Sequence, residues 1–288
     1  MMAEMRIHGV NIRRPWWFAW GGLALASLSL LWVAGCGRGS AATQAAGRPS
    51  ATESSRAASP NTPATPTERA IAQAGRDGKY SFLLFFRSKE QASEAMRDTF
   101  GRAKGKLGAK AAFLPVDVAA EAEAGLVEKY RAQQAPLPLT LVIAPNGATI
   151  RAFTKPVDEQ ALAGAFVSQK VAAVAKALQD KKVVALCLQG PSTTHNGESK
   201  RAAEGFIADQ KLGGQGVLIS ADPSREAELI RRCGMTSPPT EATIVLLAPP
   251  GSMVAAVAGA TTKEALLKKL QSASSSCSSG SCGPSGCQ

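Results

Sequence analysis

Short apolar runs recur along the chain and are separated by segments whose apolar residues recur at helical spacing. Tyr80–Phe86 is almost wholly apolar, which is typical of a strand buried on both faces. Further strands are predicted at 111–118, 139–143, 150–153, 183–188, 216–220, 244–247 and 254–257. Helices are predicted at 69–76, 90–104, 121–133, 158–180, 198–210, 225–233 and 263–271. The pattern therefore predicts an α/β protein.

The order of these elements occurs twice. Residues 103 positions apart match in type, as Val116 matches Ile219 and Thr140 matches Thr243. After the predicted hairpin turn at 145–147 the offset becomes 104, so we place one inserted residue near the second hairpin turn. The sequence thus predicts two copies of one domain, at 69–170 and 171–271.

An apolar stretch near the N-terminus follows several arginines and ends in Val33-Ala34-Gly35-Cys36. This ending resembles the lipobox of bacterial lipoproteins, in which the signal peptide is cut before the cysteine and the cysteine is lipidated. The resemblance implies a signal peptide at 1–35, a lipid on Cys36 and a periplasm-facing protein of the bacterial cell envelope. Gly37 stands where aspartate often marks inner-membrane retention, which favours the outer membrane. The alternative is an uncleaved anchor, since residues 16–35 are about long enough to span a bilayer.

Composition changes sharply after Cys36. Residues 36–68 are mostly Ala, Ser, Thr, Pro and Gly, so we expect a disordered linker between the membrane and the first domain. The chain carries a net charge of +11, but it has only two Tyr and no dense run of Lys and Arg. This pattern does not indicate a nucleic-acid-binding protein. The partners we expect are the membrane, through the lipid anchor, and a protein of the envelope.

Several short stretches of the first repeat carry a resemblance to thioredoxins. They are Phe85 on the first buried strand, Val116-Asp117-Val118, Leu126–Tyr130 and Pro138–Gly147. The resemblance implies a thioredoxin-like fold in each repeat, with a central mixed sheet flanked by helices. It also implies that Pro138 is the family's cis-proline, which shapes a peptide-binding groove. The matching position in the second repeat is Glu241.

The redox motif of thioredoxins is missing from both repeats. Its two cysteine positions fall on Glu90 and Ser93 in the first repeat, and on Thr193 and Asn196 in the second. Thioredoxin chemistry needs a thiolate at a helix N-terminus, where the helix dipole lowers the thiol pKa. We therefore expect neither domain to exchange disulfides in the ordinary way.

The chain has six cysteines, and five remain if Cys36 is acylated. An odd number leaves at least one thiol free, bound to a metal or paired between molecules. Cys187 lies within an apolar strand and is expected to be buried, while Cys233 ends a helix. Whether Cys187 and Cys233 form a disulfide is left open by the sequence. His195, in the loop that replaces the second redox motif, is a solvated histidine or, alternatively, a catalytic one.

Residues 272–288 form a Ser-, Gly- and Cys-rich tail, which we expect to be flexible. Its cysteines recur every five residues, at Cys277, Cys282 and Cys287. Three thiolates could meet at one Cu(I) ion, or at Zn(II) with a fourth ligand. The alternatives are a redox tail that presents a disulfide to a partner, and a tail whose cysteines simply oxidise or cross-link two chains.

These features favour a non-enzymatic function, namely binding or scaffolding of an envelope protein, with metal capture by the tail as an additional role. The competing function is that of a thiol–disulfide oxidoreductase, or of its redox partner, whose thiols come from the tail. One fold hosts many functions, so the thioredoxin resemblance alone does not decide between them.

Overall fold

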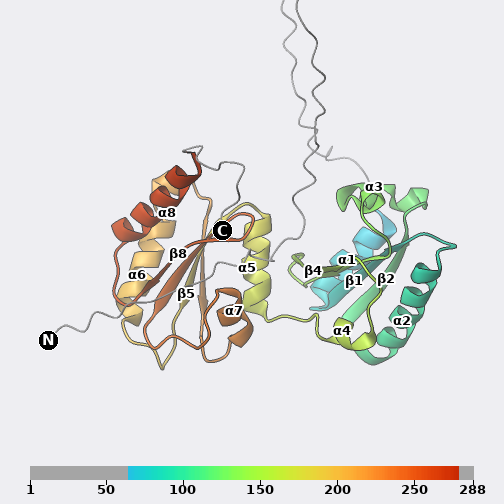
Figure 1. Ribbon diagram of the computed structural model, residues 1–288, viewed down its shortest axis with the longest axis horizontal. Coiled ribbons are helices and arrows are strands. Elements are labelled where there is room, and N and C mark those ends of the chain that lie inside the picture. The colour runs from blue at the N-terminus through green and yellow to red at the C-terminus, as the bar shows by residue number, and fades with distance from the viewer. Residues whose placement is uncertain (1–63, 279–288) are drawn as a thin grey trace, which may run out of the picture. The chain divides into compact units, whose positions relative to one another are not determined.

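The computed structural model describes residues 64–278, which form two α/β domains (Figure 1). The predicted signal peptide, Cys36 and nearly all of the predicted linker lie outside the described residues, as do Cys282 and Cys287. Within residues 64–278, no helix is both long and apolar enough to cross a membrane.

The first domain is built on a four-stranded sheet in the order β2-β1-β3-β4. β1 runs parallel to β2 and antiparallel to β3, which pairs antiparallel with β4. The strands are β1 (Tyr80–Phe86), β2 (Ala111–Asp117), β3 (Leu139–Ile143) and β4 (Thr149–Phe153). One face packs against α2 (Gln91–Leu107) and α4 (Glu159–Ala163), and the other against α1 (Pro66–Arg76) and α3 (Ala124–Lys129).

The second domain repeats this arrangement with the strand order β6-β5-β7-β8. Its strands are β5 (Val183–Leu188), β6 (Gly216–Ala221), β7 (Thr243–Ala248) and β8 (Ser252–Ala258). One face packs against α6 (Asn196–Ile207) and α8 (Lys263–Ser278), and the other against α5 (Gln169–Gln179) and α7 (Ala227–Arg232). Short 3₁₀ turns lie at Glu121–Glu123, Ala132–Gln134 and Gln210–Leu212. The prediction of two tandem thioredoxin-like domains is confirmed.

The central strands are apolar on both sides because helices cover both faces of each sheet. In β1, Phe82 and Phe85 point to opposite faces and both are fully buried. Phe82 stacks on Phe113 of β2 with the ring centroids 5.0 Å apart. A strand of this composition buries the most apolar surface when it lies in the middle of a sheet that is covered on both faces. β1 lies in that position.

The single helix predicted at 158–180 is in fact two helices, α4 and α5. α4 ends at Gly164, and α5 begins after Ser168, whose hydroxyl accepts a hydrogen bond from the Val171 N–H at 3.2 Å. α5 buries Val171 and Leu178 in the core of the second domain. α5 therefore has the same place in the second domain as α1 has in the first. The domain boundary predicted at 170/171 falls inside α5.

α5 also covers the outer edge of β4. Small residues make the contact, with Ala172 and Ala175 of α5 packed near Ala144 and Ala148. The side chain of Gln179 accepts from the Thr149 N–H at 3.1 Å and donates to the Thr149 carbonyl at 2.6 Å. The backbone groups of Thr149 that point away from the sheet are thus satisfied by a side chain.

The last helix is longer than predicted. α8 extends to Ser278, whereas the sequence pattern predicts an end near Gln271 and a tail from Ser272. No Gly or Pro interrupts residues 263–278, and Ala and Ser are tolerated in helices. Cys277 accordingly lies within α8.

The sheets correct the alignment of the two repeats. Both hairpins carry an irregularity, between Val142 and Ile143 and between Leu246 and Leu247, which are 104 positions apart. The second repeat therefore has two extra residues between β5 and β6 and one fewer between β6 and β7, so the offset of 104 is reached before β7 and not in the hairpin turn. The counterpart of Pro138 is consequently Ala242 and not Glu241. The pairing of β5 with β6 also makes Ala221, and not Ile219, the counterpart of Val116.

Candidate functional site

In the first domain, the degenerate redox positions lie at the start of α2. Glu90 is the N-cap residue, and its side chain caps no backbone N–H. Ser93 lies in the first turn, is only 1% exposed, and donates a 3.5 Å hydrogen bond to Glu90 Oε2. Arg87 lies 3.6 Å from Glu90 Oε1. The helix terminus thus presents a carboxylate and a buried hydroxyl, neither of which attacks a disulfide.

The loop before α2 is fastened to the end of β2. The Ser88 hydroxyl donates to Asp117 Oδ2, and the Ala119 N–H donates to Asp117 Oδ1 at 3.0 Å. These hydrogen bonds, with that of Ser88 the larger cause, lower the pKa of the Asp117 carboxyl. Asp117 is therefore an ionised acceptor that positions the loop and is poorly suited to act as a general base.

Pro138 directly precedes β3, and the Leu137–Pro138 peptide bond is cis. Leu139 pairs with Phe85, so Pro138 lies opposite the end of β1, where the chain leaves for α2. Leu137 is half-buried, and its N–H and C=O have no hydrogen-bond partner within residues 64–278. A backbone donor and a backbone acceptor are therefore unpaired next to the α2 N-terminus.

The second domain is arranged differently at the same place. The Thr193 hydroxyl accepts from the Gly190 N–H at 2.8 Å and donates to Asn196 Oδ1 at 2.6 Å. The Asn196 amide donates to the Gly190 carbonyl at 2.9 Å. α6 begins only at Asn196, after an exposed His195 with φ of 58°. Thr193 and Asn196 therefore close a loop and expose no reactive group.

The backbone groups around the second site are occupied by the protein's own chain. The Thr194 N–H donates to the Thr240 carbonyl at 3.1 Å, and the Ala242 N–H donates to the Thr194 carbonyl at 2.9 Å. Thr194 thereby forms a parallel bridge with Glu241, the counterpart of Leu137 in the corrected alignment. The bridge uses the C=O and the N–H of the residues that flank Glu241, and the Glu241 N–H, like that of Leu137, has no backbone partner within residues 64–278. In the first domain the counterpart of Ala242 is Pro138, which has no N–H to donate. No sequence signal pointed to this long-range pairing.

Two cysteines, Cys187 and Cys233, are fully described, and both are free and buried. Cys187 faces α6 and α8, whereas Cys233 packs on the opposite face of the same sheet with α5 and α7. The sheet separates them, so a Cys187–Cys233 disulfide does not fit this fold. Burial raises the pKa of each thiol to about 11, with the Glu204 carboxylate adding to the shift at Cys187.

Both thiols should therefore resist alkylation in the folded protein. An unperturbed cysteine has a pKa of about 8.5, so at pH 8 the shift lowers the thiolate fraction on the order of 100-fold. Iodoacetamide labelling at pH 8, followed by peptide mass spectrometry, should find Cys187 and Cys233 at least 100-fold slower than in guanidinium chloride. Labelling at equal rates with and without denaturant would show that the second core opens readily.

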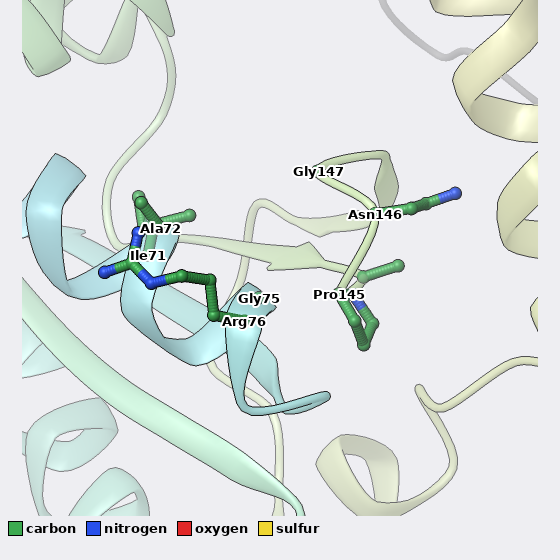
Figure 2. Close-up of a pocket in the computed structure, with 8 residues that line it drawn as sticks. Ile71, Ala72, Gly75, Arg76, Pro145, Asn146 and Gly147 are labelled. Carbon is green, nitrogen blue, oxygen red and sulfur yellow. The ribbon is translucent and has the colours of Figure 1, made fainter.

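A groove of about 430 Å³ lies between α1 and the turn from β3 to β4 (Figure 2). Its lining is Ile71, Ala72, Gly75, Arg76 and Ala144–Gly147. In Figure 2, α1 lies on one side of the groove and the turn on the other, and the Asn146 side chain points away from α1. The groove has no thiol, carboxylate or imidazole, and the Arg76 guanidinium is held by Gln73 Oε1 at 2.5 Å. It offers no catalytic group.

Metal binding was expected at the tail, and only Cys277 of its three cysteines lies in the described chain. Among the residues described, no three His, Cys, Asp or Glu side chains are grouped so as to hold a metal ion. Cu(I) or Zn(II) binding by Cys277, Cys282 and Cys287 stays a prediction.

Comparison with known proteins gives matches among solved structures only. No family model and no curated protein matches the chain. The thioredoxin Deadhead of Drosophila melanogaster is 22% identical, with 35% of this chain and 90% of that chain covered and a TM-score of 0.29. A disulfide isomerase of Xylella fastidiosa is 17% identical over 39% and 88% of the two chains, with a TM-score of 0.27. Human ERp44 is 13% identical over 70% of this chain and 56% of its own, with a TM-score of 0.32. What the chain shares with these proteins is the thioredoxin fold.

Proposed function

We propose that this protein is a binding or scaffolding module of the bacterial cell envelope and not a thiol–disulfide enzyme. The absence of a thiol from the N-termini of both α2 and α6 carries the proposal. Thiol–disulfide exchange starts with an accessible thiolate. Cys187 and Cys233 are buried thiols of raised pKa and cannot supply one.

The first domain is the proposed binding site. Leu137 offers an unpaired N–H and C=O beside the α2 N-terminus, which suits the backbone of an extended segment. The second domain supports a backbone ligand at this place, because the Thr194 backbone lies along the matching segment and bonds to the Thr240 C=O and the Ala242 N–H, on either side of the counterpart of Leu137. We therefore infer that an extended segment of an envelope protein binds the first domain, whereas the second is closed by its own loop.

The proposal includes a lipid on Cys36 and a spacer at 36–68, which would hold the two domains near a membrane surface. A diacylglyceryl group together with an N-acyl chain would exceed the two signals that stable membrane anchoring requires. Growth with a radiolabelled fatty acid would test the anchor. Label should enter the protein and be lost in Cys36→Ala.

A photo-crosslinking amino acid placed at Lys89 or at Ser192 tests the binding site in the full-length protein in cells. The two positions are 103 residues apart, and both side chains are exposed in the loop before the helix. We expect a covalent adduct with an envelope protein from position 89, and at least about tenfold less from position 192, because Thr194 occupies that site. Equal adducts from both positions, or none from position 89, would contradict the proposal.

Insulin reduction by the full-length protein distinguishes the proposal from the oxidoreductase alternative. Neither the parent protein nor the Cys277→Ser, Cys282→Ser, Cys287→Ser variant should reduce insulin above the background rate of dithiothreitol. Activity that is lost in the triple variant would favour the redox function of the tail and overturn the binding proposal.

A further inference from the structure

Sheet edges expose unpaired backbone groups, and each edge of the first domain carries a feature that disfavours pairing. β2 carries Pro115, which has no N–H, and it ends in Asp117. β4 carries Arg151, and Gln179 of α5 occupies the outward N–H and C=O of Thr149. Both edges are therefore interrupted, β2 by a proline and β4 by a side chain that occupies the groups at its start.

β8, the edge of the second domain that corresponds to β4, has no such protection. Its seven residues, Ser-Met-Val-Ala-Ala-Val-Ala, include no charged residue and no proline. Met253 is 50% exposed and is the one large apolar side chain with high exposure in the described chain. The N–H and C=O groups on its outer side have no hydrogen-bond partner within residues 64–278. β6, the opposite edge, is also uncharged, but none of its side chains is fully exposed.

The alignment of β8 with β4 identifies which backbone N–H and C=O groups of β8 are free. Ile143 pairs with Thr149 and Leu247 pairs with Met253, directly after the same irregularity in each hairpin. Met253 is therefore the counterpart of Thr149, and its N–H and C=O point away from the sheet, where the first domain has Gln179.

The first helix of a second copy does not fit this place. α1 has Arg69 and Arg76 at the positions where α5 has Ala172 and Gln179. The amide of Asn146, which donates to the Ala172 carbonyl at 2.9 Å, is replaced in the second domain by Pro250. The contacts that hold α5 on β4 are therefore absent between α1 and β8. Pairing with another strand is the remaining way to form hydrogen bonds with the outward N–H and C=O groups of β8.

We propose that β8 pairs antiparallel with β8 of a second copy, so that the two second-domain sheets join into one eight-stranded sheet across a two-fold axis. In such an interface each residue meets the same segment of the partner, and a charged edge would meet its own charge. Without the predicted signal peptide the net charge is still +9, which opposes contact between two copies over most of the surface. β8 is an extended edge segment free of charge, so it meets its own copy without like-charge repulsion.

Two full-length chains with different epitope tags, expressed together, provide the test. A photo-crosslinking amino acid at Ser252, which is exposed at the start of β8, should give a covalent product that carries both tags and persists under reducing conditions. Ala256→Lys, which places two lysines close together across the pair, should lower the yield at least tenfold. Ala152→Lys is the matched control, because Ala152 is the exposed counterpart of Ala256 on the protected strand β4 and should leave the yield unchanged.

Circular dichroism of both lysine variants must match that of the parent, which shows that the charge acts on pairing and not on folding. A crosslinked product that joins β8 to a different protein would overturn the proposal. Crosslinked products that carry only one of the two tags, with none that carries both, would overturn it too. An equal loss of yield in Ala152→Lys and Ala256→Lys would overturn it too, since the edge of β4 is already occupied at Thr149 by Gln179 of α5.

Discussion

Cysteines placed at Glu90 and Ser93 are expected to turn the first domain into a dithiol that reduces insulin, from no activity in the parent chain. Residue 90 is the N-cap of the seventeen-residue helix α2, where the helix dipole favours a thiolate. Thiols in this setting have pKa values near 7 or below, against about 8.5 when unperturbed, which raises the thiolate fraction at pH 7 about tenfold. Glu90 caps no N–H, so its replacement removes no helix cap.

The same pair in the second domain, Thr193→Cys with Asn196→Cys, is the matched control and should stay inactive. Position 193 precedes α6 by three residues, so a thiol there lies outside the helix terminus. The exchange also removes the hydrogen bonds to Gly190, each worth about 1 kcal/mol, and should lower the melting temperature. If the two double variants reduce insulin equally, the loop closed by Thr194 does not make the second site less able than the first to hold a reactive dithiol.

Much of the fold could be predicted because its strongest signals are local. The apolar run at Tyr80–Phe86 is typical of a strand covered on both faces, and it forms β1. The break between α4 and α5 was missed even though Ser168 is an ordinary N-cap residue, because the Ala-rich pattern on both sides continues through it. The end of α8 was missed for the opposite reason, since Ser-rich composition suggested a tail where the backbone still forms a helix.

For the candidate site, too, the local features could be predicted from the sequence and the long-range ones could not. The lack of thiols at Glu90, Ser93, Thr193 and Asn196 is a property of the sequence itself. The difference between the two sites is not, because it depends on Thr194 pairing with residues more than 40 positions later. Residue identity gives no sign of a single bridge of this kind, which forms when the complete domain brings the two segments together.

A truncation of Phe206 on α6 should be among the most destabilising single changes in the second domain. Phe206 is fully buried and packs with Leu246 and Leu266 between the sheet and α8. Phe206→Ala should lower the free energy of unfolding by about 3–5 kcal/mol, because the lost apolar contacts are accompanied by a cavity. Chemical denaturation followed by circular dichroism measures the loss. Lys200→Ala, on the exposed side of the same helix, should change stability by less than about 0.5 kcal/mol.

The two repeats provide a second variant that tests the packing argument. At the equivalent positions the first domain has Phe100 and Ala103, and the second has Ala203 and Phe206, so the large and small residues are exchanged along the helix. Adding Ala203→Phe to Phe206→Ala restores the volume and should recover part of the lost stability. Recovery should be incomplete because Phe100 packs edge-on against Phe113 at 5.3 Å, and Leu218 stands at the position of Phe113 in the second domain. A double variant less stable than Phe206→Ala alone would mean that backbone position, and not volume, decides which residue each helix carries.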